Sequence, residues 1–196
     1  MGDIDGYNKY GTDRDVNKDE IVYKFLSEED LKSGLLDEFN RYQKVSDVWR
    51  IIDSEKKIIH NPFVDDWDKK EKDEIVEEFK DCIHKKGSVI TALHKGKIIA
   101  FACISGNLFG SLKQYADLIH LYVSKEYRHL GLGRKLFHMC AEEAKSYGAH
   151  KLYISAHSSV ESQAFYNSLG CTDAEEINKH HAEMEPYDFQ MEYKCF

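Results

Sequence analysis

The chain has 196 residues, enough for one well-packed domain and too few for two comfortable ones. Acidic residues outnumber basic residues by 35 to 27, which gives a formal net charge of −8. This balance argues against general nucleic-acid or anionic-membrane binding, because both need a broad basic field. A cationic small substrate suits the charge better, although a modest acidic balance is also ordinary for soluble proteins.

The cysteine pattern indicates a reducing compartment. The five cysteines have neither CxxC spacing nor a pairing pattern, and their odd number leaves one over in any disulfide scheme: Cys82, Cys103, Cys140, Cys171 and Cys195. No charged start is followed by an apolar run, and the sequence has no apolar stretch of about 18 residues. These features predict a cytoplasmic protein that is neither secreted nor membrane-spanning.

Residues 1–20 are polar, rich in Asp and Gly, and without an apolar period, which predicts a flexible or loosely docked tail before a single domain over 21–196. Part of this tail is spaced like the start of a calcium loop: Asp13, Asp15, Asn17 and Asp19. The spacing then fails, because Lys18 and Lys24 occupy the positions of the required glycine and bidentate glutamate. We therefore predict no calcium site.

The first elements are a strand and a helix. Alternation over 21–26 predicts the strand, and Ser27 followed by three acidic residues is typical of a helix N-cap. Leucines and Phe39 at helical spacing extend the predicted helix to about 40. The next segment, 41–67, is harder to assign: Val45, Val48 and Trp49 fit one face of a second helix, and the Asn-Pro-Phe sequence at 61–63 predicts a turn.

The middle of the chain has clearer patterns. Segment 68–86 is charge-dense with one apolar face, which predicts an amphipathic helix ended by Gly87. Strands are predicted at 88–94 and 97–106, joined as a hairpin at Lys95-Gly96, and a further strand at 114–123.

The remaining elements complete the predicted fold. After the segment 124–133 come an amphipathic helix, a strand at 151–156, a helix at 159–169 closed by Gly170, and a strand at 189–195. Ser158 and Glu161 form an S-x-x-E capping box for the second of these helices, and its predicted buried face is Val160, Ala164, Phe165 and Leu169. The order predicts a mixed α/β fold: a mostly antiparallel sheet of six to seven strands with helices on both faces.

The most informative stretch is 117–148, where an apolar segment meets a basic loop, Arg-His-Leu-Gly-Leu-Gly at 128–133, that passes directly into the helix. Glycines allow backbone conformations closed to other residues, and a helix start carries unpaired N–H groups and a partial positive charge. Basic residues crowd the same place although they oppose the helix dipole: Arg128, His129, Arg134 and Lys135. A bound polyanion would reverse that penalty, so the pattern predicts an anion site.

The loop lacks the residues of two common phosphate-binding motifs. It has no GxxxxGK[ST] sequence, and Leu136 stands where GxGxxG requires its third glycine. It does match [RQ]xxGx[GA] after a strand, and a second pattern, Ser-Ser-Val-Glu-Ser-Gln-Ala-Phe-Tyr-Asn-Ser-Leu-Gly at 158–170, lies downstream. In these two motifs the chain resembles the GNAT superfamily of N-acetyltransferases, from about residue 21 to the end.

This resemblance implies the GNAT fold and acetyl-CoA as the cofactor. The loop backbone would wrap the coenzyme A pyrophosphate, and the strand before it would pair with the pantetheine arm, which requires that strand to splay from its neighbour, as a bulge would allow. Serine at 159, where the family often has Asn, and cysteine at 171, where Phe is usual, depart from the pattern. The implied cofactor-binding residues are Leu121, Val123, Arg128, His129, Leu130, Gly131, Leu132, Gly133, Arg134 and Ser159.

The resemblance also implies a catalytic acid. Tyr166 follows Phe165 in the Phe-Tyr pair that family members carry near the end of this helix. In that position the phenol lies near the cofactor sulfur and can protonate the departing thiolate. A core tyrosine with a satisfied hydroxyl is the alternative role for the same residue.

The sequence does not identify the general base that would deprotonate the acceptor amine. Asp117 lies eleven residues before Arg128, where some family members place a glutamate base, and His120 has the better intrinsic pKa for the task. A bulge would change which face each side chain occupies, and a water relay needs neither of them. The sequence therefore predicts Asp117, His120 or water.

Two further segments bear on the acceptor. By resemblance, the long insert over 41–86 lies near the acceptor cleft, and so does an acidic and aromatic loop at 180–188, which would suit a cationic amine. The adjacent His180 and His181 are not accompanied by an HExxH or a CxxC motif, so no metal site is predicted.

The sequence thus predicts an acetyl-CoA-dependent N-acetyltransferase that acetylates a primary amine of a small molecule or peptide by direct transfer in a ternary complex. Two other readings remain: a non-catalytic acyl-CoA-binding regulatory module, and a nucleotide-binding fold. A nucleic-acid or membrane partner is not expected, and a homodimer is left open.

Overall fold

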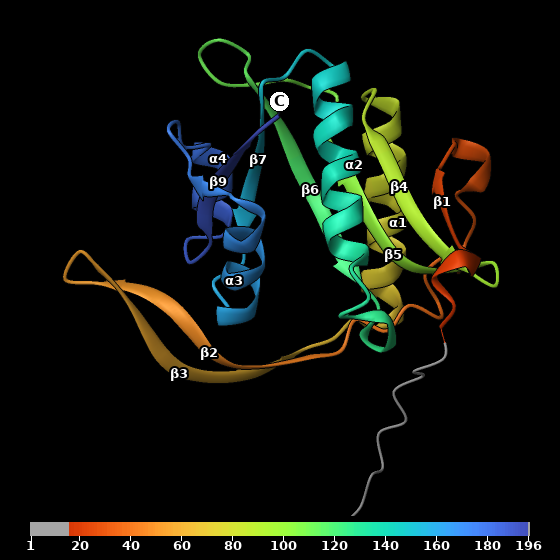
Figure 1. Cartoon of the computed structure of the whole chain (residues 1–196), viewed down its shortest axis with the longest axis horizontal. Helices are drawn as coiled ribbons and strands as arrows, with labels where there is room; N and C mark the ends of the chain where they lie inside the picture. Colours follow the sequence, from red (N-terminus) through yellow and green to blue (C-terminus); the bar gives the residue numbers. More distant parts are fainter. Residues whose placement is uncertain (1–15, 196) are drawn as a thin grey trace, which may run out of the picture.

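The computed structural model describes residues 16–195, which form a seven-stranded main sheet with helices on both faces and a long two-stranded hairpin beneath it (Figure 1). The main-sheet order is β1-β4-β5-β6-β7-β9-β8, and all neighbours are antiparallel except β6 and β7. The predicted fold class is confirmed. The strands are β1 (Ile21–Phe25), β2 (Gln43–Ile52), β3 (Glu55–Asp65), β4 (Ser88–His94), β5 (Lys97–Ile104), β6 (Tyr115–Val123), β7 (Lys151–Ala156), β8 (Thr172–Asp173) and β9 (Phe189–Lys194).

Four α-helices accompany these strands in the described part of the chain: α1 (Lys69–His84), α2 (Leu132–Ser146), α3 (Val160–Leu169) and α4 (Lys179–Met184). Most of the predicted tail, including Asp13 and Asp15 of the calcium-like sequence, lies outside the described residues, and Lys18–Glu20 form one 3-10 turn that leads into β1. None of the helices formed by residues 16–195 has the length and apolar character needed to span a membrane.

The two faces of the sheet carry different cores. Along β5, Phe101 and Cys103 belong to the core that includes the apolar face of α1, while Ala100 and Ala102 belong to the core that includes α2. All four are fully buried. Because alternate strand residues face opposite sides, the small residues on one face allow α2 to lie close to the strand.

The predicted helix over 28–40 is wrong. Glu28–Asp30 form a 3-10 turn, and further turns with i→i+3 bonds follow up to Phe39. Gly34 interrupts a helix because its φ is +80°, and a Cβ there would meet a neighbouring carboxylate oxygen at 2.8 Å. The apolar spacing still identified buried residues, since Leu36 and Phe39 both lie in the core.

The predicted second helix within 41–67 is also wrong, because this segment forms the β2–β3 hairpin. Its turn residues Asp53 and Ser54 have φ of +54° and +65°, as a tight two-residue hairpin turn requires. Val45 and Val48 are both buried although they are three residues apart, since the strand register shifts between Val45 and Asp47. The helical spacing of these valines is therefore produced by an irregularity in a strand.

The predicted turn at 61–63 lies inside β3. The regular pairing of β2 and β3 is interrupted between Phe63 and His60, so Pro62 falls at the irregularity. Proline has no N–H to give to a strand ladder and is accommodated where the ladder is broken.

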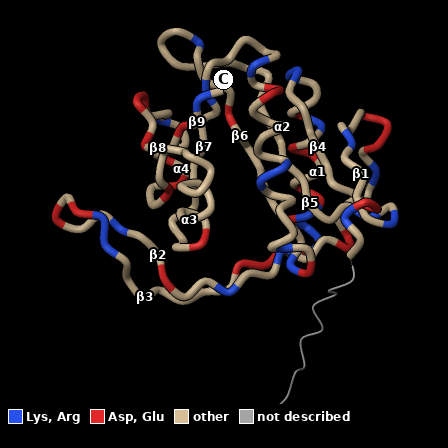
Figure 2. The backbone as a smooth tube through the Cα atoms, viewed as in Figure 1, with Lys and Arg blue, Asp and Glu red and all other residues tan. Residues whose placement is uncertain are grey.

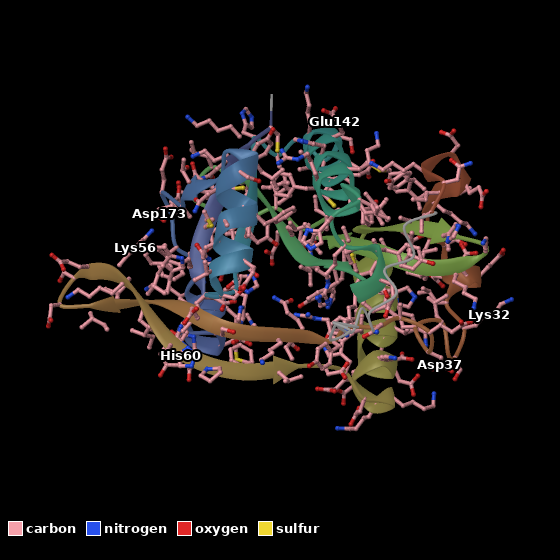
Figure 3. All side chains as sticks on the ribbon, turned by 60° about the horizontal axis from the view of Figure 1, so that its bottom comes forward. Lys32, Asp37, Lys56, His60, Glu142 and Asp173 are labelled. Carbon is pink, nitrogen blue, oxygen red and sulfur yellow. The ribbon has the colours of Figure 1, made fainter. Side chains whose placement is uncertain are left out.

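The hairpin passes beneath the main sheet and reaches its far half (Figure 1). The Trp49 N–H donates to the Ser158 carbonyl at 2.8 Å, and the Arg50 guanidinium donates to the Ser158 hydroxyl at 2.7 Å. Nearer the tip, the Lys56 ammonium contacts the Asp173 carboxylate at 2.8 Å, and these two side chains lie side by side in Figure 3. The hairpin thus ties the two halves of the main sheet together.

These contacts correct the predicted start of α3. Ser158 is engaged by the hairpin, and the N-cap is Ser159, whose hydroxyl accepts the Ser162 N–H at 3.2 Å. The predicted Ser158–Glu161 capping box is therefore wrong. Within the helix, Leu169 is buried as predicted, but Ala164 is exposed and Gln163, which was not predicted, is buried.

β6 and β7 are paired only near their starts. Their parallel register covers Tyr115, Ala116 and Asp117, after which the described strands diverge. The register of β6 against β5 shifts at the same level: Cys103 pairs with His120 and Ile104 with Leu118, which leaves Ile119 as an extra residue. The splay and the bulge that cofactor pairing would require are both present.

Candidate active site

A groove of about 1000 Å³ lies at the end of the main sheet where β6 and β7 separate. The second half of β6, the loop before α2, and α3 line it, together with residues from the two ends of the hairpin and from the segment after α4. Both α2 and α3 begin at this end of the sheet, above the hairpin (Figure 1).

One end of the groove is the start of α2. Gly131 is the N-cap residue with φ +89°, and His129 also has a positive φ, +67°. The Lys135 N–H donates to the Gly131 carbonyl at 3.1 Å, so the N–H groups before it fall outside the helical ladder. Basic positions lie at this helix start (Figure 2), and Arg134 lines the groove. Helix dipole, N–H groups and positive charge together make a site for a polyanion.

Arg128 is held by backbone carbonyls. Its Nε donates to the Val123 carbonyl at 3.1 Å, and its Nη2 donates to the Arg41 carbonyl at 2.9 Å. Burial lowers its pKa, and the positive charge of Arg41 adds to that effect. Arg128 thus braces the loop against the end of β6 and the entry to the hairpin, while the residue itself still lines the groove.

Most of the residues predicted from the sequence line this groove: His120, Leu121, Val123, Arg128, His129, Gly131, Leu132, Gly133, Arg134 and Tyr166. Three others do not belong to its lining. Leu130 packs against the core on the α2 side, Ser159 is fully buried as the cap of α3, and Asp117 is hydrogen-bonded to His181 of α4.

Tyr166 enters the groove from α3. Its ring packs against Phe137 and Phe165, with centroid distances of 6.2 and 5.1 Å. Burial raises its pKa well above the usual range, and nearby groups that include Tyr122 and Asp188 add to the rise. The phenol therefore stays protonated at ordinary pH and can donate a proton.

The two base candidates lie on the same face of β6. Before the bulge Asp117 faces away from α2, and after it His120 does so too, since Leu118 and Leu121 pack on the α2 side. The His120 Nε2 lies 2.6 Å from a carboxylate oxygen of Glu78. The Asp117 Oδ2 lies 2.6 Å from the Nε2 of His181. Each candidate is thus paired, but with a different element.

The other end of the groove is acidic. Glu185 and Asp188 line it next to His181, and red positions lie around α4 in Figure 2. Burial raises the pKa of Asp188 to about 6, and the negative charge of Glu185 adds to the rise, while Arg50 and His181 oppose it. The predicted loop over 180–188 is partly wrong, because its first part belongs to α4, whose N-cap Asn178 accepts the His180 N–H.

The sequence did not predict the contact between Asp117 and His181, which are 64 positions apart in the chain. It also missed Arg41, which lines the groove, forms an ion pair with Asp65 and stacks 4.9 Å from the Tyr122 ring. The cluster of acidic and aromatic residues near His181 was the only signal for this end of the groove. Among residues 16–195, no group of three or more Cys, His, Asp or Glu side chains is arranged to hold a metal ion.

Comparisons with known proteins agree with this geometry. The family model of the acetyltransferase (GNAT) family matches residues 52–171, more than half of the chain. The chain therefore belongs to the acetyltransferase (GNAT) family, and by that membership it is an N-acetyltransferase. The resemblance predicted from the loop and the downstream helix is confirmed. No curated protein matches the sequence.

Solved structures share the fold at low identity. A nourseothricin acetyltransferase is 14% identical with a TM-score of 0.67, covering 90% of this chain and 99% of that one. A protein described as a streptothricin acetyltransferase from Bacillus anthracis str. Ames, in complex with acetyl coenzyme A, is 19% identical with a TM-score of 0.63, covering 90% and 98%. The ribosomal-protein-S18-alanine N-acetyltransferase from Escherichia coli is 17% identical with a TM-score of 0.54, covering 89% and 94%.

The raised pKa of Asp188 predicts a pH-dependent stability. An unfolded aspartate titrates near about 3.9, and Asp188 in the folded protein titrates at about 6. Its ionised form is thus disfavoured by folding, so the penalty is complete above pH 6 and fades as the pH falls toward 4. We predict that Asp188→Asn raises the free energy of unfolding by about 1–2 kcal/mol at pH 8 and by much less at pH 4, in urea denaturation.

A matched control is Asp81→Asn, which changes an exposed carboxylate on α1 and should alter stability little at either pH. Equal stabilisation by Asp188→Asn at pH 4 and pH 8 would contradict the assignment.

Proposed function

We propose that this protein moves the acetyl group of acetyl-CoA to a primary amine of a small cationic molecule or peptide, by direct transfer in a ternary complex. The observation that carries the proposal is the charge pattern of one groove, with a basic glycine loop at one end and Glu185 and Asp188 at the other. Acetyl-CoA supplies an activated acetyl thioester. The chain binds its polyanionic part and places the amine beside it.

The loop and β6 would hold the cofactor. The backbone N–H groups over 129–134 and the side chain of Arg134 suit a pyrophosphate, because the helix start presents them together. Beyond Asp117, β6 has no pairing with β7 among the described residues, so the edge at Leu121 and Val123 can accept an extended arm as an added strand. Arg128 would support this arrangement by fixing the loop to the strand end.

Tyr166 would be the general acid. Its raised pKa keeps the phenol protonated at ordinary pH, so the proton is available in the groove that the ring lines. The fixed packing against Phe137 and Phe165 limits its movement.

The cysteines favour direct transfer over a covalent acetyl-enzyme. None of the described residues that line the groove is a cysteine. Burial raises the pKa of the Cys171 thiol to about 12 and raises that of Cys140 further, so neither thiol is a ready nucleophile. A ternary complex needs no such group.

The acceptor is proposed to be cationic because the far end of the groove is acidic. Asp188 and Glu185 line it, and their carboxylates can pair with an ammonium group. Two of the structural neighbours carry the names nourseothricin and streptothricin acetyltransferase, which makes streptothricins the first acceptors to try, followed by polyamines, aminoglycosides and peptides.

Two measurements separate this function from its alternatives. At a ligand concentration of about 100 times Kd, binding adds about 2.7 kcal/mol of stability, so acetyl-CoA should raise the melting temperature and NAD and ATP should not. Thiol release from acetyl-CoA over the amine panel then distinguishes the enzyme from a non-catalytic acyl-CoA-binding module. Absence of a shift with acetyl-CoA would overturn the proposal, and a shift without thiol release for any amine would favour the module.

The role of Tyr166 predicts a defect in turnover. We expect Tyr166→Phe to lower kcat by about 10²–10³-fold and to leave acetyl-CoA binding unchanged, because only the hydroxyl is removed. Steady-state thiol release and the acetyl-CoA melting shift measure the two effects. Tyr193→Phe is the matched control, since Tyr193 packs against Phe137 outside the groove lining. Full turnover in Tyr166→Phe would refute the general-acid role.

The loop geometry predicts a defect in cofactor binding. Gly131 and Gly148 both have positive φ, +89° and +87°, and an added Cβ would meet nothing within 4 Å at either position. Alanine at each should therefore destabilise the protein similarly, by about 1 kcal/mol. Only Gly131→Ala should also weaken acetyl-CoA binding, measured by calorimetry, because Gly131 is at the helix start that faces the groove. Equal acetyl-CoA affinity in the two variants would contradict the proposed pyrophosphate site.

A further inference from the structure

We infer that His181 is the residue that takes the proton from the acceptor's ammonium group, and that Asp117 is the residue that positions it. The inference rests on the proposed function and deepens it, because it names the general base. The sequence had left that role open between Asp117, His120 and water. The observation is a hydrogen bond of 2.6 Å between the Asp117 Oδ2 and the His181 Nε2, at the acidic end of the groove.

The His181 ring is held from two sides. Besides the bond to Asp117, it stacks on Tyr153 with a centroid distance of 6.0 Å and an interplanar angle of 22°. The Tyr153 hydroxyl accepts the N–H of Asn178, the N-cap residue of α4, at 2.8 Å and donates to the Gln190 side chain at 2.7 Å. Strands β6 and β7 thus fix both the ring and the start of the helix that carries it.

The pairing also fixes the tautomer. A carboxylate is an acceptor, so the neutral imidazole donates its Nε2 proton to Asp117 and keeps its lone pair on Nδ1. His181 lines the groove, so the ring can reach an acceptor bound there. The second carboxylate oxygen, Asp117 Oδ1, is buried and has no hydrogen-bond partner among the described residues. A positive charge on His181 would balance this poorly compensated carboxylate.

The groups around His181 favour its protonated form. The hydrogen bond to Asp117 raises its pKa, burial opposes the rise, and the charges of Asp117 and Asp188 add to it. Glu185 contributes a further negative charge beside Asp188, and Tyr153 faces the ring as a neutral phenol. A raised pKa makes His181 a stronger base for an ammonium proton.

His120 has a different environment. Its Nε2 is bonded to Glu78 on α1, and its ring lies among Phe79, Phe101 and Tyr122, with centroid distances of up to 6.3 Å. These contacts belong to the α1 side of the sheet. We assign His120 a packing role, although it borders the groove.

In the proposed reaction the ammonium group of the acceptor loses two protons. An N–H bond of the ammonium breaks and its proton moves to the His181 Nδ1, which leaves an electron pair on nitrogen. That pair forms the new C–N bond as the C–S bond breaks. The departing sulfur takes the Tyr166 proton, a second proton from nitrogen restores the phenol, and the proton on His181 passes to solvent.

The first test removes the base and keeps the hydrogen bond. In His181→Gln the side-chain amide can still donate to Asp117 but cannot accept a proton at neutral pH. We expect kcat to fall by about 10²–10³-fold while the acetyl-CoA melting shift stays as in wild type. His180→Gln is the matched control, because His180 is an exposed neighbour outside the groove lining, and it should keep full turnover.

The outcomes of this test are distinct. Wild-type turnover in His181→Gln, or a larger loss in His120→Gln than in His181→Gln, overturns the inference and leaves the proposed function standing. Absence of thiol release in the wild type with every amine overturns the proposed function and the inference with it. In that case an NMR titration of the His181 ring can still test whether Asp117 raises the pKa of His181.

The second test addresses the positioning role. Asp117→Asn removes the negative charge and should lower the pKa of His181, so the acid limb of the pH profile of kcat/KM should move to lower pH relative to wild type with the same amine. An NMR titration of the His181 ring protons should show the same downward shift in the absence of any substrate. A lower kcat with an unmoved acid limb and an unmoved His181 titration would mean that Asp117 is only structural, and would overturn the inference.

Discussion

The bulge at Ile119 determines which side chains of β6 face each layer of the molecule. Before the bulge, Leu118 packs on the α2 side; after it, Leu121 does, so His120 lies on the opposite face with Asp117. Without the extra residue, Leu118 and His120 would share a face, since alternate strand residues point the same way. A bulge also bends its strand, and it lies next to the point where β6 leaves β7. The single extra residue therefore lies where the groove opens, and it places Asp117 and His120 on the same face of β6.

The short pairing of β6 with β7 leaves the sheet weakly joined at its centre. Only three residue pairs connect the two strands. The β2–β3 hairpin adds a second connection, because Trp49 and Arg50 bond to Ser158 and Lys56 contacts Asp173. The hairpin therefore supports the open end of the sheet where the groove lies, and it brings Arg41 and Asp65 to the groove at its two ends.

The sequence predicted what depends on neighbouring residues. The β4–β5 hairpin, α1, and the loop into α2 follow from local spacing and glycine positions, and all are present. The family and the groove-lining loop could be inferred from two short motifs for the same reason. The β2–β3 hairpin was missed because the irregularity after Val45 spaces two buried valines as in a helix, and Asp53-Ser54 is a weaker turn signal than Asn-Gly.

The candidate base could not be predicted because it depends on tertiary geometry. Asp117 and His181 are far apart in the chain and meet only when α4 docks on β7 through Tyr153. The face of His120 depended on a bulge that the apolar pattern of β6 does not specify. The acidic character of 180–188 was visible in the sequence, but its helix and its partner strand were not.

Amide hydrogen exchange with and without coenzyme A tests the central claim most directly, namely that the groove where β6 and β7 separate holds the cofactor. Exchange should slow over 129–134 and at the end of β6 around Leu121 and Val123, and it should stay unchanged in β1, on the far edge of the sheet. Protection confined to other segments, with 129–134 exchanging as in the free protein, would contradict the account.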